Sequence, residues 1–461
     1  MSSKLNIDLL NRDSLVNLGI KLKINGYTNS FSSPYLKKDQ IKSIILLFFK
    51  EHKKKNRSNS LNNTESLKQS PLNISNSLNN TESLKQSPLN RSKSLPNIRN
   101  MQNSNNSNNF EGNDIFKINC IFPKVNKLVA IGDIHGDLSV AIKSLKLAGV
   151  ISMNISDELK DISKINWTGG NTFVVQLGDQ IDRVRPEKYY NNLCVEENNI
   201  VEDEGSDLKI ICLFEMLNAQ ALKVGGALIS ILGNHELMNV DKDFRYVSPK
   251  EFREFGNFFN GKLEFNSNVP YGYKERLEAF KPGGILSKKL ALTRFSVVQV
   301  GSWIFVHGGI TPQCANEYSL DEINYYIRKW LYGDESYENM QHVNKLYHND
   351  DDEYSPFWSR TFSDMEQWCD TKCLNEFKKT LHYVNIKNRR SNNSIIKGMV
   401  MGHSPQFMYN KSINSSANNR LWRVDVGASR AFGEIDDNNR LVQVLVINND
   451  NDFSILREKK N

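Results

Sequence analysis

The 461-residue chain lacks several features that would place it in a simple class. Its longest fully apolar run in the N-terminal region is Ile44–Phe49, far short of the roughly 20 residues that a membrane-spanning helix needs. The first ten residues are polar and lack the apolar core of a secretory signal, and the six cysteines are scattered without a C-x-x-C pair. We therefore expect a cytoplasmic protein that uses no membrane and keeps its cysteines as free thiols in a reducing compartment.

The part of the chain expected to fold also lacks an excess of basic residues, although the whole chain carries a formal charge of +7. Residues 50–100 hold 10 basic and 3 acidic side chains, so the remainder carries 49 of each sign. A nucleic-acid-binding domain usually concentrates positive charge on its folded part. The charge distribution thus argues against specific nucleic-acid binding.

Residues 56–109 differ in composition from the rest, because 28 of these 54 residues are Asn or Ser and none is aromatic. The run NSLNNTESLKQSPLN begins at Asn59 and recurs 17 residues later from Asn76. Each unit has too few apolar residues for a solenoid, so a duplicated disordered linker is the favoured interpretation. Ahead of it, Pro34–Lys55 fits an amphipathic helix that either docks on its own domain or binds a partner or membrane surface.

From about Asp114 onward, short apolar runs alternate with helical patterns, as in an α/β domain whose strands are buried on both faces. The expected strands include Leu128–Ile131, Phe173–Leu177, Ala227–Leu232, Trp303–Val306 and Met399–Met401. The acidic segment Pro186–Asp207 interrupts this pattern and is expected to be a surface insertion. The chain therefore divides into an N-terminal segment without an assigned role, a low-complexity linker and a folded domain, at residues 1–55, 56–113 and 114–461.

Each of the five apolar runs is followed at once by a small polar cluster, at the strand ends where α/β sheets usually bind ligands. The clusters read GDIHGD from Gly132, GDQIDR from Gly178, GNHE from Gly233, HGG from His307 and GHS from Gly402. Any single cluster has an ordinary explanation, such as a helix-capping Asp, a surface ion pair or a structural His. Four of the 8 histidines lie in these clusters, and their coincidence with Asp and Asn favours a metal site.

In this order the clusters resemble the pattern GDxHG…GDxxDRG…GNHE…HGG…H of the calcineurin-like metallophosphoesterases, and among them the phosphoprotein phosphatases. The chain is most similar to the Shewanella-like, bacterial-type branch, over Leu128–Val150, Trp167–Arg183, Gly225–Val247, Ser355–Arg360 and Met401–Gln406. The resemblance covers about Asp114 to the C-terminus. It implies an α/β sandwich of two mixed β-sheets flanked by helices, preceded by the disordered Asn/Ser-rich segment.

The resemblance implies a dinuclear metal site in the catalytic domain 114–461. One ion would be held by Asp133, His135 and Asp179, and the second by Asp179, Asn234, His307 and His403. The cofactors would be two divalent ions, and this mixed ligand set suits manganese, iron or zinc without deciding among them. Glu236 is expected beside the ligands rather than among them.

The resemblance also assigns the remaining catalytic roles. His235 would protonate the leaving group, with Asp182 orienting its imidazole, while a metal-activated water attacks phosphorus. Arg183 and Arg360 would bind the phosphate, since the planar fork of arginine matches two of its oxygens. Val184 stands where the family has Gly, a difference that bears on how Arg183 is placed.

Three functions fit this site: a phosphomonoesterase acting on phosphoproteins, a phosphodiesterase or dinucleoside-polyphosphate hydrolase, and a catalytically silent binding module. Pro405 stands where many diesterases have the second His of G-H-x-H, and Asp182 and Glu236 differ from the dinucleoside-polyphosphatase pattern. No expected ligand or acid is missing. These residues favour a phosphoprotein phosphatase, with a regulatory partner at the N-terminal segment left open and phosphoserine, phosphothreonine or phosphotyrosine specificity undecided.

Overall fold

The computed structural model describes residues 115–459 except for residues 160, 187–188, 191–192, 195–201, 262–268, 350–353, 364–370, 390–393 and 436. The expected helix Pro34–Lys55 and linker 56–113 lie outside the described residues. Within the described part, no helix is long and apolar enough to cross a membrane.

One six-stranded mixed sheet has the strand order β14-β13-β2-β3-β6-β7. Its strands are β2 (Lys127–Ile131), β3 (Phe173–Gln176), β6 (Ala227–Ile231), β7 (Arg294–Phe295), β13 (Gln443–Asn448) and β14 (Asp452–Arg457). β2, β3, β6 and β7 run parallel, whereas β13 is antiparallel to both β2 and β14. The parallel pairing brings the carboxyl ends of β2, β3 and β6 to one edge of the sheet.

The second six-stranded mixed sheet has the order β1-β8-β9-β10-β12-β11. Its strands are β1 (Ile121–Phe122), β8 (Val297–Val300), β9 (Trp303–Val306), β10 (Gly398–Met401), β11 (Asn414–Ser416) and β12 (Leu421–Arg423). β9, β10 and β12 run parallel, so their carboxyl ends also lie at one edge. A small antiparallel pair, β4 (Tyr189–Tyr190) and β5 (Leu193–Cys194), lies within the predicted insertion Pro186–Asp207.

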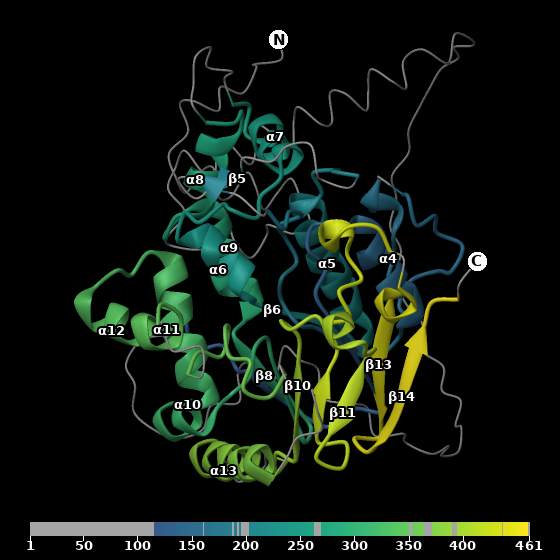
Figure 1. Cartoon of the computed structure of the whole chain (residues 1–461), viewed down its shortest axis with the longest axis vertical. Helices are drawn as coiled ribbons and strands as arrows, with labels where there is room; N and C mark the ends of the chain where they lie inside the picture. Colours follow the sequence, from purple (N-terminus) through teal and green to yellow (C-terminus); the bar gives the residue numbers. More distant parts are fainter. Residues whose placement is uncertain are drawn as a thin grey trace, which may run out of the picture. The chain divides into compact units, whose positions relative to one another are not determined.

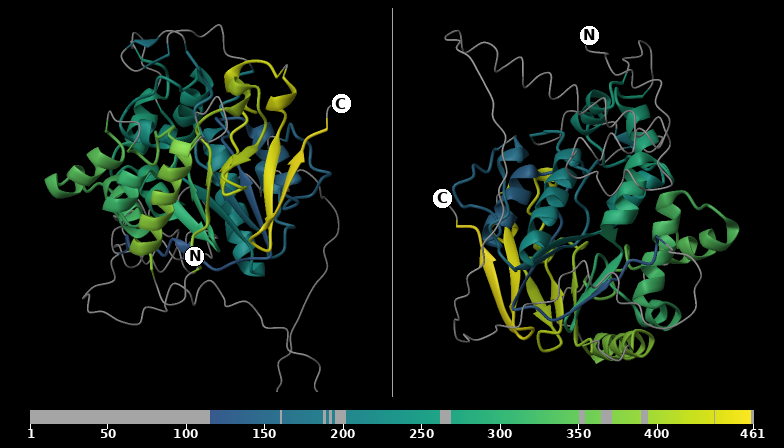
Figure 2. Two further views of the ribbon diagram at one scale, coloured as in Figure 1. Left: turned by 60° about the horizontal axis from the view of Figure 1, so that its bottom comes forward. Right: turned by 180° about the vertical axis from the view of Figure 1, so that it is seen from behind.

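Helices cover both outer faces of the paired sheets (Figure 1). The α-helices are α4 (Leu138–Leu147), α5 (Asp207–Ala221), α6 (Asn234–Val240), α7 (Pro249–Phe258), α8 (Tyr273–Phe280), α9 (Ile285–Thr293), α10 (Pro312–Glu317), α11 (Leu320–Tyr332), α12 (Tyr337–Leu346) and α13 (Thr371–Lys387). α4 and α5 pack beside the sheet that contains β2, and α10 to α13 gather on the side of the other sheet (Figure 2).

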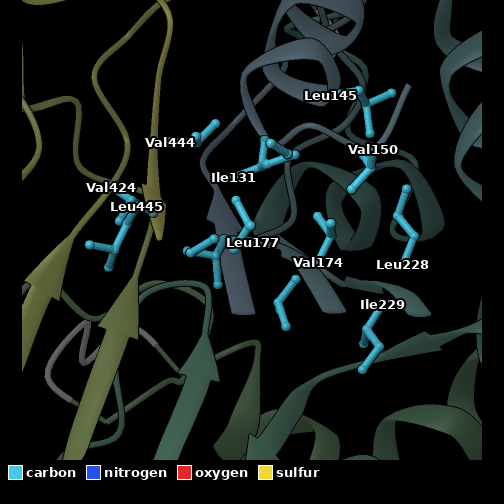
Figure 3. Packing of buried hydrophobic residues seen from close by; sticks show 14 of the residues in the cluster. Ile131, Leu145, Val150, Val174, Leu177, Leu228, Ile229, Val424, Val444 and Leu445 are labelled. Atoms are coloured by element: carbon cyan, nitrogen blue, oxygen red, sulfur yellow. The ribbon is translucent and has the colours of Figure 1, made fainter. Parts of the chain in front are cut away.

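The core consists of two large apolar clusters separated by the second sheet. One cluster combines β2, β3, β6 and β13 with α4 and α5, and includes Val174, Leu145 and Leu445 (Figure 3). The other lies under α9 to α13. Neighbouring residues of β9 divide between them, with Phe305 in the first and Val306 in the second, as expected for a strand buried on both faces.

The expected fold class is confirmed, since two mixed sheets are flanked by helices. The five expected strands all form, and their ends differ from the predicted ones by at most one residue. The expectation that every cysteine is a free thiol is wrong for Cys373, which is disulfide-bonded. Cys120, Cys212 and Cys314 are free, as expected.

Candidate active site

The polar clusters predicted from the sequence meet where the two sheets bring their carboxyl edges together. Asp133 and His135 follow β2, Asp179 follows β3, and Asn234 begins α6 directly after β6. His307 and His403 follow β9 and β10, which are neighbours in the second sheet. The fold thus gathers six side chains from five strand ends into what we call the strand-end cluster: Asp133, His135, Asp179, Asn234, His307 and His403.

Tight backbone turns present these side chains. His135, Asp179, Asp182 and His403 have φ angles of 46°, 49°, 74° and 67°, in the left-handed region that residues other than glycine seldom adopt. Such conformations cost on the order of 1–3 kcal/mol each and occur preferentially at functional sites. Here they turn each side chain away from its strand and into the shared space.

Two glycines permit the close approach of the turns. A Cβ on Gly233 would lie 2.0 Å from Asp179 Oδ1, and a Cβ on Gly402 would lie 2.4 Å from Asp133 Oδ1. Both contacts are shorter than any side chain allows, so glycine is required at these positions.

Asp133, His135 and Asp179 form one half of the cluster. The Nδ1–H of His135 points at the Ile181 carbonyl, 3.4 Å away, which leaves Nε2 with its lone pair. This Nε2 lies 3.9 Å from Asp133 Oδ2 and 3.8 Å from Asp179 Oδ2. These separations are too long for hydrogen bonds and suit ligand atoms arranged around a cation.

His307, Asn234 and Asp179 form the other half, together with His403. His307 donates its Nδ1–H to the Leu177 carbonyl at 2.7 Å, so in the neutral ring Nε2 is an acceptor. That nitrogen lies 2.9 Å from Asn234 Oδ1 and 3.2 Å from Asp179 Oδ2, which are acceptors as well. Three acceptors at this distance repel one another unless a proton or a metal ion lies between them.

The pKa values of the cluster's carboxyl and imidazole groups are strongly shifted. Burial, followed by the carboxylates of Asp425 and Asp179, raises the pKa of Asp133 well above its usual range. Burial opposes ionisation of Asp179 too, but His307 and His235 outweigh it and hold its pKa well below the usual value. Burial and neighbouring cationic groups lower the pKa of His135 and His403 well below normal, which keeps both rings neutral and able to ligate. The donor set therefore fits divalent cations.

Glu236 fixes the turn that carries Asp179. Its carboxylate accepts hydrogen bonds from the backbone N–H groups of Asp179 at 3.0 Å, Gln180 at 2.7 Å and Gly233 at 2.7 Å. Burial, followed by the nearby Asp179, raises the pKa of Glu236 to about 7. As expected, Glu236 lies beside the ligands and braces two of the turns.

His235 and Asp182, expected to be the general acid and the group that orients it, are joined by a hydrogen bond. The Nδ1–H of His235 donates to Asp182 Oδ2 at 2.9 Å, and Asn239 donates to both carboxylate oxygens of Asp182 at 3.0 Å. His235 Nε2 then faces the strand-end cluster, 3.9 Å from Asp179 Oδ2. The ring is therefore held through Nδ1 by Asp182, and its Nε2 faces the strand-end cluster.

A second buried acidic group, which sequence reasoning missed, continues behind Asp182. Arg276 donates to Asp182 at 2.9 Å, to Asp207 at 2.8 Å and to the Asn239 side-chain oxygen at 2.7 Å. Burial, followed by Asp207, raises the pKa of Glu251 well above its usual range, which favours its protonated form. We call Asp182, Asp207, Glu251 and Arg276 the Arg276 cluster.

Arg183, which was expected to bind phosphate, has several partners of its own. Its fully buried guanidinium lies 3.2 Å from Asp137 Oδ2 and donates to the carbonyl of Gly136 at 3.2 Å and to Glu204 at 3.3 Å. These partners lie at the start of α4 and in the insertion, so Arg183 joins these two segments. Val184 needs no left-handed backbone and pairs its N–H with the Tyr246 carbonyl at 3.0 Å, so the missing glycine causes no strain.

Arg185 is a second arginine near the strand-end cluster, and sequence reasoning did not single it out. Its guanidinium stacks over the Phe432 ring at 4.6 Å and the Tyr246 ring at 5.3 Å, and donates to the Asp182 carbonyl at 3.2 Å. Burial lowers the pKa of Arg185, and the carboxylates of Asp179 and Asp182 partly offset this effect. Because Arg185 is close enough to interact with Asp179, it provides a cation beside the strand-end cluster, two residues after Arg183.

Arg360 lies on the opposite side, close to His403. The Trp358 carbonyl on the same turn accepts the Nε2–H of His403 at 3.2 Å, and Arg360 helps to lower the pKa of that histidine. Arg360 is half-buried, and no described residue forms a hydrogen bond or ion pair with its guanidinium. It is thus an arginine held beside the cluster with its donors available.

Asp425, which follows β12, is a buried carboxylate near the strand-end cluster that sequence reasoning missed. It is 2% exposed, and its charge acts on both Asp133 and Asp179. The signal was present, because the buried run Leu421–Val424 is followed at once by Asp425, like the five clusters that were recognised. Arg276, Asn239 and Glu251 lie on helices and carry no comparable signal.

Comparisons with known proteins agree with this geometry. The family model described as calcineurin-like phosphoesterase matches residues 127–407. Shewanella-like protein phosphatase 2 of Arabidopsis thaliana is 30% identical over 363 residues, which cover 73% of this chain and 78% of that protein. An uncharacterised protein of Acanthamoeba polyphaga mimivirus is 35% identical over 272 residues, 54% of this chain and 99% of its own length.

Among solved structures, the cold-active protein-tyrosine phosphatase of a psychrophilic Shewanella species aligns with a TM-score of 0.47. The two sequences are 20% identical, and the alignment covers 75% of this chain and 85% of the other.

Proposed function

The chain belongs to the calcineurin-like phosphoesterase family, and from this premise we propose that it is a metal-dependent phosphomonoesterase that acts on phosphoproteins. The observation that carries the proposal is the meeting of His307 Nε2, Asn234 Oδ1 and Asp179 Oδ2 within 3.2 Å of the histidine nitrogen. With a neutral His307 these three atoms are all acceptors, an arrangement that is unfavourable in a protein interior without a cation or a proton. Burial lowers the pKa of His307, but Asp179 outweighs this effect and raises it, so the site favours a positive charge at this nitrogen. Relatives named as protein phosphatases support the choice of substrate class.

Six side chains would hold the ions. Asp133, His135 and Asp179 face one position, and Asp179, Asn234, His307 and His403 face another, so Asp179 would bridge the two. Divalent ions bound there would supply an activated water nucleophile and neutralise charge on the phosphate. The second-sheet histidines are held in their ligating tautomers by the Leu177 and Trp358 carbonyls.

His235 would act as the general acid. Because Asp182 accepts the Nδ1–H, the proton to be transferred is carried on Nε2, the nitrogen that faces Asp179. Transfer from Nε2 to the leaving oxygen would turn a poor alkoxide leaving group into an alcohol. Asn239 and Arg276 hold Asp182 in place throughout, so the imidazole keeps its direction.

Arg185 and Arg360 would bind the phosphate from two sides. Arg185 is clamped between aromatic rings, and Arg360 stands on the turn that also holds His403. Each has guanidinium N–H groups to spare, and charge-assisted bonds from arginine to phosphate oxygens are strong and directional.

The test is metal analysis followed by a substrate panel. The full chain is stripped with a chelator, reloaded with Mn²⁺, Fe²⁺ or Zn²⁺, and assayed on phosphoserine, phosphothreonine and phosphotyrosine peptides, bis-p-nitrophenyl phosphate and a dinucleoside tetraphosphate. We expect two ions per chain and metal-dependent release of phosphate from at least one phosphopeptide. Faster cleavage of the diester or the dinucleotide would replace the proposal with the hydrolase alternative, and metal binding without any turnover would favour the silent binding module.

A further inference from the structure

A further buried carboxylate, Asp425, lies close to Asp133 and helps to raise its pKa. Asp133 and Asp425 each have one carboxylate oxygen that is bound by a backbone donor. His403 N–H donates to Asp133 Oδ2 at 3.0 Å, and Gly427 N–H donates to Asp425 Oδ1 at 2.8 Å. The other two oxygens, Asp133 Oδ1 and Asp425 Oδ2, are buried and have no hydrogen-bond partner among the described residues.

The backbone around Asp425 fixes the carboxylate at this place. A Cβ on Gly132 would lie 2.6 Å from the Val424 carbonyl oxygen and 3.1 Å from Asp425 Cα, so β12 runs directly against the turn that carries Asp133. On its other side, Gln406 N–H donates to the Asp425 carbonyl at 2.9 Å. Asp425 therefore stands between the Asp133 turn and the loop that follows His403.

Three other buried carboxylates in the described structure are paired with a guanidinium. Asp182 and Asp207 share Arg276, and Asp137 is paired with Arg183 and Arg430. Asp425 is 2% exposed, yet no ion pair with an arginine, lysine or histidine satisfies it. An uncompensated buried carboxylate is strongly destabilising, so a carboxylate kept in this position needs a positive charge from another source.

We propose that Asp425 is a fourth protein ligand of the first metal position, where its free Oδ2 joins Asp133, His135 and Asp179. This inference rests on the proposed function, because it requires that the cluster holds two ions. The ligand would come from β12, and not from the position after His403, where Ser404 and Pro405 offer no imidazole. Carboxylate oxygen is a suitable fourth ligand for a hard or borderline divalent ion.

Asp425→Asn is the sharpest test, because the amide oxygen still accepts the Gly427 N–H while the charge is lost. The full chain is freed of metal, and Mn²⁺ binding is followed by calorimetry and by metal content after gel filtration. We expect two Mn²⁺ per wild-type chain, and in Asp425→Asn a loss of about 10–100-fold in affinity at one position with the other retained. In the presence of EDTA at about pH 8, the variant should melt at or above the wild-type temperature, because a buried unpaired charge has been removed.

Asp450→Asn is the matched control. Asp450 is also buried, and its Oδ1 accepts the Ser302 N–H at 3.0 Å in the turn between β13 and β14. The same substitution there removes the same formal charge, so Mn²⁺ affinity at both positions should stay at the wild-type value.

The outcomes separate this inference from the function on which it rests. If wild type and Asp425→Asn bind two Mn²⁺ with equal affinity, Asp425 is not a ligand, whereas the two-ion site stands. If the wild type binds no divalent ion, the proposed function fails first. Should Asp425→Asn be insoluble, Asp425→Ser is measured in the same way, since its hydroxyl can accept the Gly427 N–H; unchanged Mn²⁺ affinity there would also overturn the inference.

Discussion

The Arg276 cluster and the strand-end cluster are both buried and acidic, but they differ in the source of their positive charge. The Arg276 cluster contains its own cation, since Arg276 binds Asp182 and Asp207 at 2.9 Å and 2.8 Å. The strand-end cluster contains no arginine or lysine, and its Asp179 lies 3.2 Å from His307, whose pKa is raised against the effect of burial. Asp133 Oδ1 in this cluster and Oδ2 of the neighbouring Asp425 are left without donors among the described residues. Arg185 and Arg360 lie beside it and not between its ligands.

By proximity of donor atoms alone, both groups could hold a metal. His135, Asp179 and His235, then Asp179, His307 and His403, and also Asp182, Asp207 and Glu251, each bring ligand atoms within 4.8 Å of one another. The third set differs because the guanidinium of Arg276 already pairs with Asp182 and Asp207, although Glu251 Oε1 has no hydrogen-bond partner among the described residues. The comparison teaches that a cluster of acids that contains its own guanidinium is not by itself a metal site.

The largest effect is expected at His235, which links the two clusters through Asp182. His235→Ala removes the proton donor and should lower kcat on a phosphoserine peptide by about 10²–10⁴-fold. The loss should be much smaller on p-nitrophenyl phosphate, because its leaving group is stable without a proton. The measurement is kcat for both substrates at saturating Mn²⁺. Equal losses on the two would contradict the assigned role and leave His235 as a residue of the metal site only.

The next largest effect should come from removing the internal cation. Arg276→Met leaves Asp182 and Asp207 without their guanidinium, and breaking a buried pair in this way costs about 3–5 kcal/mol of unfolding free energy. Urea unfolding of wild type and variant measures the difference. The double variant Arg276→Met/Asp207→Asn should recover part of the loss. If Mn²⁺ restored the stability of Arg276→Met, the acidic group would itself be a metal site and the comparison would fail.

Sequence reasoning located the strand-end cluster because its signal is local. Each of Asp133, Asp179, Asn234, His307 and His403 follows a buried strand within a few residues, and parallel strands deliver such positions to one edge. The sandwich followed from the same pattern and from the family resemblance. These inferences needed only short-range order along the chain.

The remaining features depend on contacts that are distant in sequence. Arg276 is 94 residues from Asp182, and nothing about its helix, α8, predicts that the guanidinium is fully buried. The partners of Arg183 were equally unpredictable, because its motif fixes the residue type but not the contacts of the side chain with Asp137 and Glu204. Asp425 had the strand-end signal, but it falls outside the recognised motifs.

Replacing Arg185 and Arg183 by alanine, one at a time, tests which of the two binds the phosphate and which stabilises the fold. Arg185→Ala should lower kcat/KM on p-nitrophenyl phosphate by about 10²-fold, the loss typical for one donor that faces transition-state charge, with little change in melting temperature. Arg183→Ala should instead lower the melting temperature, since Asp137 and Glu204 lose a buried partner. The paired assays of activity and thermal unfolding decide. A stable but inactive Arg183→Ala together with an active Arg185→Ala would return the phosphate-binding role to Arg183.

The smallest expected effect is on how the stability of the metal-free protein changes with pH. The direction of this change tests whether the carboxylates near the strand-end cluster lack a cation of their own. Burial raises the pKa of Asp425 to about 6 and of Glu236 to about 7, and it raises the pKa of Asp133 as well. For an acid whose folded-state pKa exceeds its unfolded value, the folded protein binds more protons between the two values. The stability of the metal-free protein should therefore fall as pH rises from about 5 to about 8, by about 2 kcal/mol. His135 and His403 oppose this trend below about pH 6.5, because their pKa values are lowered in the folded state.

With saturating Mn²⁺ the sign should reverse, because the ion replaces the protons and binds best to ionised ligands. Melting temperatures across this pH range, with EDTA and with Mn²⁺, provide the measurement. Asp425→Asn should flatten the EDTA curve, since one of the titrating groups is gone, whereas Arg276→Met should lower both curves without bringing their slopes together. Identical slopes in EDTA and Mn²⁺ would mean that the ion does not compete with protons for these carboxylates, and the strand-end cluster would then be satisfied in the same internal way as the Arg276 cluster.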